Sequence, residues 1–107
     1  MTTSYQIIYW RDIPAQVKVK TAHRPLSRQL PERFERAIDR AAMHAGKINS
    51  DDYLAEWRKS DWQERQGEPE AALEALVAEI EAAYPEDYLR EMARNGGFEA
   101  KEQVESD

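Results

Sequence analysis

The amino-acid sequence predicts an α+β fold with two layers, in which an N-terminal β-hairpin packs against three to four helices. Three observations predict this class. Residues 5–21 hold many β-branched and aromatic side chains, later segments repeat apolar residues every three or four positions, and prolines or glycines separate the segments. A chain of 107 residues has room for one hydrophobic core. We therefore expect one domain over residues 1–97, followed by an acidic, frayed tail over residues 98–107.

The hairpin is predicted from residues 5–21. Residues 5–10 are rich in Tyr, Ile and Trp, which suit a strand, and residues 11–14 form the expected turn, because Pro14 fixes its φ angle and lacks an N–H. Residues 15–21 then alternate between apolar and polar side chains, as a half-buried strand does. A connection this short joins antiparallel strands.

The register of the hairpin decides which of its side chains share a face. We expect Val17 and Val19 to point toward the helices, because a hairpin alone is marginally stable in water. One possible register sets these valines opposite Ile8 and Trp10. In that register the tyrosines of the first strand share a face with the lysines of the second, which groups Tyr5, Tyr9, Lys18 and Lys20.

Amphipathic helices are predicted after the hairpin. Residues 31–45 begin with a proline in the first turn, carry an alanine-rich apolar stripe and end at Gly46. Ser50 is expected to cap the next helix, because serine favours that position. The helices expected further along cover residues 51–59, 69–84 and 85–94, and a third short strand is expected near residues 62–66.

Charge is divided unevenly along the chain. Residues 11–40 contain eight Lys or Arg and four Asp or Glu, a local charge of +4. Residues 41–107 contain seven Lys or Arg and seventeen Asp or Glu, a local charge of −10. Such a division is typical either of solvated helix faces or of a surface that meets a partner.

The sequence holds no motif for catalysis or for a cofactor. There is no cysteine, which excludes disulfides, thiolate metal sites and iron–sulfur ligation by this chain. The two histidines, His23 and His44, lack the spacing of a metal site, and no serine stands in a strand-to-helix elbow. The acidic pairs at helix starts are explained by the helix dipole. We therefore expect a non-catalytic protein without a cofactor or a metal ion.

No segment is predicted to associate with a membrane. No apolar run approaches the roughly 20 residues that cross a bilayer, and the N-terminus lacks the basic and apolar regions of a signal peptide. We expect no membrane partner and a cytoplasmic location.

A protein partner is the interaction that we expect. Aromatic side chains among basic ones on an exposed strand face are typical of interfaces, although the same tyrosines could instead be covered by the chain's own later helices. A basic loop is expected over residues 23–29, after the second strand, and it extends this surface. The predicted partner-binding residues are Tyr5, Tyr9, Arg11, Lys18, Lys20, His23, Arg24 and Arg28.

A single-stranded nucleic acid is the alternative partner for the same hairpin face. Aromatic and basic side chains on a sheet stack bases and contact phosphates. The net charge of −6 opposes this, because an acidic protein repels a polyanion. We therefore expect a protein partner and no nucleic acid.

Four segments, YQIIYWRDIPAQV, RQLPERFERAIDRAAMHAG, DDYLAEWR and WQERQGEPEAA, resemble the bacterial virulence-factor domain family, in a free-standing form. The resemblance runs from about Tyr5 to Tyr84 and is most specific at IxYWRDIPAQV and LPxRFxxAID. The chain is similar to a domain of the conserved virulence factor C proteins. In those proteins the domain lies near a segment similar to the Nfu/NifU scaffold and ahead of HEAT-like repeats, and this chain has neither neighbour.

The resemblance implies an accessory role and carries over no catalytic residue. Free-standing relatives are associated with folate- and corrinoid-linked methyl transfer, which gives a further alternative: a small subunit or activator of such an enzyme. The two motifs in which the resemblance is most specific contain Arg11-Asp12 and Arg33-Phe34.

Overall fold

The structure is a computed structural model that describes residues 1–47 and 49–99. The prediction of a frayed tail falls mostly on residues 100–107, which lie outside the described residues. The described chain contains one antiparallel sheet of five strands and four helices, so the predicted α+β class is confirmed. In chain order the elements are β1 (Thr2–Trp10), β2 (Ile13–Val19), β3 (Leu26–Gln29), α1 (Glu32–His44), α2 (Ser50–Leu54), β4 (Trp57–Lys59), β5 (Gln63–Gln66), α3 (Pro69–Ala83) and α4 (Glu86–Arg94).

β1 and β2 form the predicted antiparallel hairpin, but its turn is shorter than expected. Only Arg11 and Asp12 lie in the turn, and Ile13 and Pro14 are already in β2. Arg11 has a φ of 54°, which reverses the chain within two residues. Pro14 is tolerated in the strand because the ladder shifts register next to it, where no N–H is needed.

The register that would group the tyrosines with the lysines is wrong. Val17 pairs with Ile7 and Val19 pairs with Tyr5, so these residues share one face of the sheet. Both valines are fully buried. Lys18 pairs with Gln6 and therefore lies on the opposite face. The strand Tyr5–Tyr9 thus presents its tyrosines toward the helical layer.

Three short strands complete the sheet in the order β3-β2-β1-β4, with β5 also paired to β1. β5 confirms the predicted third strand. β3 was expected to be a loop and β4 to be the end of a helix, and both expectations are wrong. β3 forms because the segment after β2 folds back beside it, from Gln16↔Gln29 to Val19↔Leu26. The helix begun at Ser50 stops at Leu54, and Trp57 then pairs with Trp10.

β4 and β5 act as one interrupted strand along β1. Ser60 joins them: its N–H donates to Ile7 O (2.9 Å), and its hydroxyl accepts from Ile7 N (3.0 Å). The Gln6 side chain donates to Ser60 O at 3.0 Å, which satisfies this buried amide. β1 is therefore paired along both edges and lies inside the sheet.

The helices begin and end largely as the sequence predicts. α1 follows Pro31, α3 starts with Pro69 and α4 follows Pro85, because proline fits the first turn of a helix. The cap of α2 is different: Asn49 is the N-cap and its side chain accepts from Asp51 N at 3.0 Å, whereas Ser50 is already helical.

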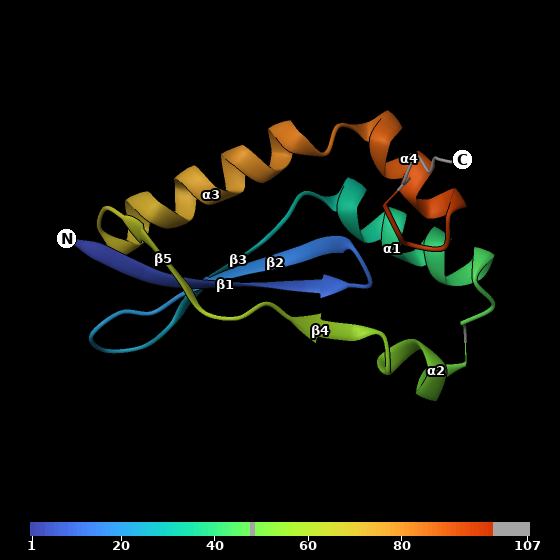
Figure 1. Cartoon of the computed structure of the whole chain (residues 1–107), viewed down its shortest axis with the longest axis horizontal. Coiled ribbons are helices and arrows are strands. Elements are labelled where there is room, and N and C mark those ends of the chain that lie inside the picture. The colour runs from blue at the N-terminus through green and yellow to red at the C-terminus, as the bar shows by residue number, and fades with distance from the viewer. Residues whose placement is uncertain (48, 100–107) are drawn as a thin grey trace, which may run out of the picture.

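The helices pack on the sheet around a single core (Figure 1). α3 lies along β1, β2 and β3, and α1 contacts both β2 and α4. The largest fully buried side chains come from the hairpin, α1 and α4: Trp10, Phe34, Ile13, Leu89, Met92, Val17, Val19 and Pro14. Burial of one such aliphatic or aromatic side chain stabilises the fold by roughly 1.5–3 kcal/mol before entropy is counted. Within the described ranges, no helix has the length and apolar character that crossing a membrane requires.

Candidate functional site

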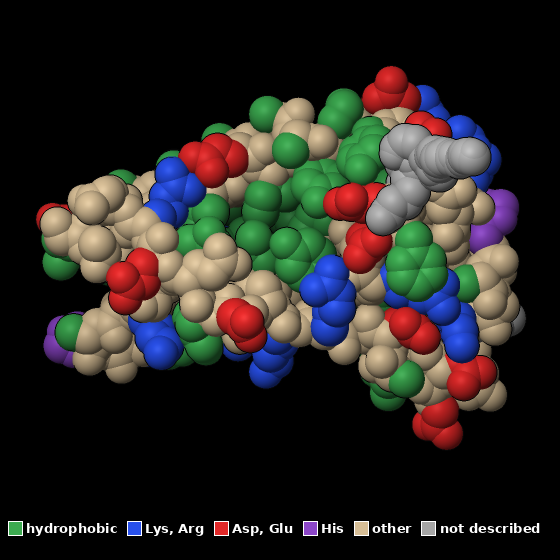
Figure 2. All heavy atoms as spheres, viewed as in Figure 1, with side chains coloured by type: hydrophobic (Ala, Val, Ile, Leu, Met, Phe, Trp, Pro, Cys, Tyr) green, Lys and Arg blue, Asp and Glu red, His purple; other side chains and the backbone are tan. Residues whose placement is uncertain are grey.

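A row of half-buried tyrosines is the most distinctive surface of the molecule. We call it the tyrosine face and define it by Tyr5, Tyr9, Tyr84 and Tyr88, with Ile7 between the first two. Figure 2 shows hydrophobic side chains gathered between α3 and the β4–β5 segment, with acidic and basic side chains around them. β1 supplies one side of the row, and the end of α3 and the start of α4 supply the other.

The four rings are held by contacts with their neighbours. Tyr84 and Tyr88 lie with ring centroids 5.6 Å apart, and Tyr84 also packs against the buried Phe34 at 6.0 Å. Tyr5 donates from its hydroxyl to the Gln63 side chain at 3.1 Å. These contacts fix the rings while each keeps part of its surface accessible to solvent.

The electrostatics of the tyrosine face favour neutral phenols. Burial, followed by the influence of Tyr9 and then of Glu99, raises the pKa of Tyr84 to about 12. Burial also raises the pKa of Tyr9, against the opposing effect of Arg58. The effect of Tyr9 on the pKa of Tyr84 is consistent with the two sides of the row lying close in space. At neutral pH the face therefore offers hydroxyl donors and apolar ring surface.

Charged side chains flank the row at both ends. The Arg58 guanidinium lies 4.4 Å from the centroid of the Tyr9 ring and 3.3 Å from Asp12 Oδ1. At the other end Arg65 forms a two-pronged pair with Glu79, with its shorter contact at 2.8 Å. An apolar centre with charged flanks is the usual anatomy of a protein interface.

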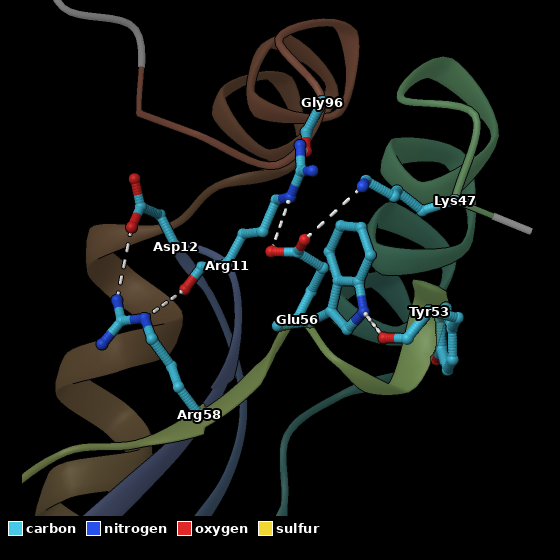
Figure 3. A network of polar contacts seen from close by, with 8 residues as sticks. Arg11, Asp12, Lys47, Tyr53, Glu56, Arg58 and Gly96 are labelled. Carbon is cyan, nitrogen blue, oxygen red and sulfur yellow. Dashed lines mark hydrogen bonds and ion pairs between the residues drawn. The ribbon is translucent and has the colours of Figure 1, made fainter. Parts of the chain in front are cut away.

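Arg11 joins the hairpin turn to two distant segments (Figure 3). Its Nη1 donates to Gly96 O, after α4, at 2.9 Å, and its Nε lies 3.2 Å from Glu56 Oε1, before β4. Its guanidinium also lies over the rings of Trp10 and Phe98. Only 12% of the side chain is exposed. Arg11 is thus a structural clamp, and its predicted role in partner binding stays a prediction.

Arg33 plays the same structural role at another helix end. Its Nη2 donates to Glu81 O at 3.0 Å and to Tyr84 O at 3.2 Å, which are carbonyls at the end of α3. A cation at a helix C-terminus satisfies free carbonyls and complements the helix dipole. Arg33 therefore positions Tyr84, which belongs to the tyrosine face.

The family comparison assigns the chain. The family model described as "Virulence factor" matches residues 8–93, which is most of the sequence. The chain belongs to the Virulence factor family. No curated protein and no solved structure matches the chain significantly.

In this Virulence factor domain, the two motifs that resemble the family most specifically, Arg11-Asp12 and Arg33-Phe34, have a structural explanation. Arg11 and Asp12 tie the hairpin turn to the end of α4, because Asp12 N–H donates to Gly97 O at 2.9 Å and Asp12 Oδ2 accepts from Glu99 N at 3.0 Å. Arg33 caps α3. Both motifs thus hold helix ends in place around the tyrosine face, and neither needs a catalytic role.

The other predicted partner-binding residues do not join the tyrosines. Lys18 lies on the opposite face of the sheet, and Lys20 Nζ lies 4.5 Å from the centroid of the Trp62 ring. His23 and Arg24 line an open recess of about 620 Å³ beside the start of α3. Arg28 forms an exposed ion pair with Glu74 of α3 at 3.6 Å. Their role in binding stays a prediction.

Nothing in the described ranges resembles a metal centre: no three His, Cys, Asp or Glu side chains gather there as ligands would. Tyr5 and Tyr9 were predicted from the sequence as site residues, whereas Tyr84, Tyr88 and Arg58 were not. Tyr84 follows the last residue of α3 as its C-cap. The signal that could have found these residues is the aromatic spacing across the Pro85 break, Tyr84 to Tyr88.

Proposed function

We propose that this Virulence factor domain is a non-catalytic binding module whose tyrosine face contacts a protein partner. The observation that carries the proposal is the row of four partly exposed tyrosines, which two helices and a central strand position together. Tyrosine provides large contact area with only two side-chain torsions to fix, which is why it is enriched at interface centres.

The charged flanks support a protein as the partner. Arg58 is held over the Tyr9 ring and Asp12 is held beside it, so charges of both signs lie at one edge of the apolar centre. A polyanion would require unpaired basic residues near the rings, whereas Arg58 and Arg65 are paired with Asp12 and Glu79. Lys18 lies on the opposite face of the sheet, so the geometry weakens the nucleic-acid alternative. Activation of a methyl-transfer enzyme remains a prediction from the family resemblance.

The test is a pull-down with purified variants followed by mass spectrometry. We expect the double variant Tyr5→Ala with Tyr9→Ala to lose the partner, because alanine removes the ring surface of β1. The matched control is Lys18→Ala with Lys20→Ala, which changes one basic side chain of β2 and one just after it. A partner that the control retains and the tyrosine variant loses supports the proposal.

Two outcomes would contradict the proposal. A folded tyrosine double variant that still captures the same protein excludes the tyrosine face as the interface. If that variant unfolds, p-benzoylphenylalanine at position 88, compared with position 18, provides the second test. Photo-crosslinking to the partner from position 18 and not from position 88 would then place the interface on the face of the sheet opposite the tyrosine face and contradict the proposal.

A further inference from the structure

A second recess lies away from the tyrosine face, between α1, the α2–β4 segment and the β2–β3 pair. Its volume is about 230 Å³. Among the described residues, its lining combines two aromatic rings with two carboxylates and includes no basic side chain. The lining residues are Ala15, Gln29, Leu30, Glu35, Ile38, Asp39, Tyr53 and Trp57.

The two rings are fixed in place by the core behind them. Tyr53 stacks on the fully buried Trp10, with ring centroids 5.7 Å apart and planes 28° apart. Trp57 meets Tyr53 edge-on, at 6.0 Å and 84°. The Trp10 indole N–H donates to Tyr53 O at 2.9 Å, a bond visible in Figure 3. A ligand would therefore meet rings that are already ordered, which lowers the entropy cost of binding.

The two carboxylates stand together at this recess without a cationic partner. Glu35 and Asp39 are four residues apart on α1, so both project to the same side of the helix. In residues 1–47 and 49–99 neither forms an ion pair with Lys, Arg or His. Both act on Tyr53, whose pKa is raised first by burial and then by the charges of Asp39 and Glu35.

We propose that this recess binds an organic ammonium cation. Aromatic ring faces attract ammonium groups, and paired acidic side chains add Coulomb attraction at the mouth of the recess. A neutral ligand would gain no Coulomb attraction to the two carboxylates, and an anionic ligand would be repelled by them. The small volume suits a methylated ammonium head group. That head group can come from a free small molecule or from a modified lysine side chain of a protein.

The test is an NMR titration of the whole chain at constant ionic strength, following the Trp57 indole N–H and the Tyr53 amide. Choline chloride is the first probe, and 3,3-dimethylbutan-1-ol is its uncharged counterpart of similar shape. We expect saturable shifts with choline and at least about tenfold weaker binding of the alcohol. A second arm uses acetylated trimethyl-lysine methylamide; tighter binding than choline identifies a protein side chain as the source, and tighter binding of choline identifies a free small molecule.

Isosteric variants test the carboxylates. Glu35→Gln with Asp39→Asn should weaken choline binding by about tenfold, and circular dichroism should show an unchanged fold because both side chains are exposed. Glu32→Gln is the matched control, since it removes a carboxylate from α1 outside the recess and should leave binding unchanged. Absence of saturable shifts with both cations, equal binding of the alcohol, or unchanged binding by the double variant would each overturn the proposal.

Discussion

Arg11 adopts a left-handed backbone conformation, with a φ of 54°, where glycine or asparagine would be accommodated more easily. A side chain other than glycine in this region costs of order 1–3 kcal/mol. The hydrogen bond of Arg11 to Gly96 O and its ion pair with Glu56 offset that cost, because they join the turn to the ends of two other elements. A turn residue that local propensity disfavours is thus favoured by distant contacts.

Arg11→Lys tests this explanation of the turn. Lysine keeps the positive charge but has one ammonium group, which cannot bond Gly96 O and Glu56 in the same way. We expect the free energy of unfolding to fall by about 1–3 kcal/mol in urea denaturation. Arg36→Lys is the control, since the pair of Arg36 with Glu32 is exposed and contributes about 0.5 kcal/mol or less. Equal losses in the two variants would contradict the clamp role.

Tyr84 gives a prediction about alkaline pH. Its pKa is 10.0 in its ordinary state and about 12 in the fold, so the folded chain holds the phenol proton more tightly than the unfolded chain. The resulting stability is fully present below pH 10 and is lost as the pH rises toward 12. We expect Tyr84→Phe to remove the last step of phenolate absorbance at 295 nm and to make this loss of stability shallower. A variant that loses absorbance near pH 10 and keeps the last step would show that Tyr84 ionises as an exposed tyrosine does.

At the scale of elements, the end of α4 packs closely against β1. A Cβ on Gly97 would lie 3.0 Å from the Trp10 ring, at a φ of +99°, whereas a Cβ on Gly67 would meet nothing within 4 Å at a φ of +114°. Both changes to alanine strain the backbone, but only the first also displaces a buried indole. We expect Gly97→Ala to lower the unfolding midpoint further than Gly67→Ala, by about 1–3 kcal/mol in free energy. Thermal unfolding of the two variants measures the difference.

The elements that the sequence predicted correctly are those with local signals. α1 and α4 each follow a proline, α3 begins with one, and all three carry an apolar stripe. The hairpin shows β-forming residues on both sides of a short turn. β3 and β4 were missed because LSRQ and WRK are short and mostly exposed, and pairing with distant strands decides their conformation. The helix expected over residues 51–59 was ended by the pairing of Trp57 with Trp10.

The tyrosine face was predicted only in part, because only some of its residues are grouped by a local sequence pattern. Tyr5 and Tyr9 could be identified because they share a strand face by period two. Their grouping with Lys18 failed because pairing register is a nonlocal property, and a shift by one residue exchanges the two faces. Tyr84 and Tyr88 lie about 80 residues further along, and only the packing of α3 and α4 brings them to the same surface.

At the scale of the whole molecule, the last described residues close on the hairpin turn. Asp12 N–H donates to Gly97 O, Arg11 donates to Gly96 O, and Glu99 N–H donates to Asp12, so residues 96–99 are fastened to the hairpin turn. The same turn is fastened to Arg58 of β4. The tyrosine face lies between these contacts, and its shape depends on segments that span almost all of the described sequence.

This closure predicts the effect of removing residues 95–99. A chain that ends at residue 94 loses the bonds to the hairpin turn and the packing of Gly97 against Trp10, whereas a chain that ends at residue 99 keeps both. Three hydrogen bonds at about 0.5–1.5 kcal/mol each indicate a difference of about 2–4 kcal/mol in the free energy of unfolding. Urea denaturation, followed by tryptophan fluorescence and far-UV circular dichroism, compares the two truncated chains directly. Identical midpoints would show that the hairpin turn and the end of α4 are energetically independent, and the tyrosine face would then not depend on that closure.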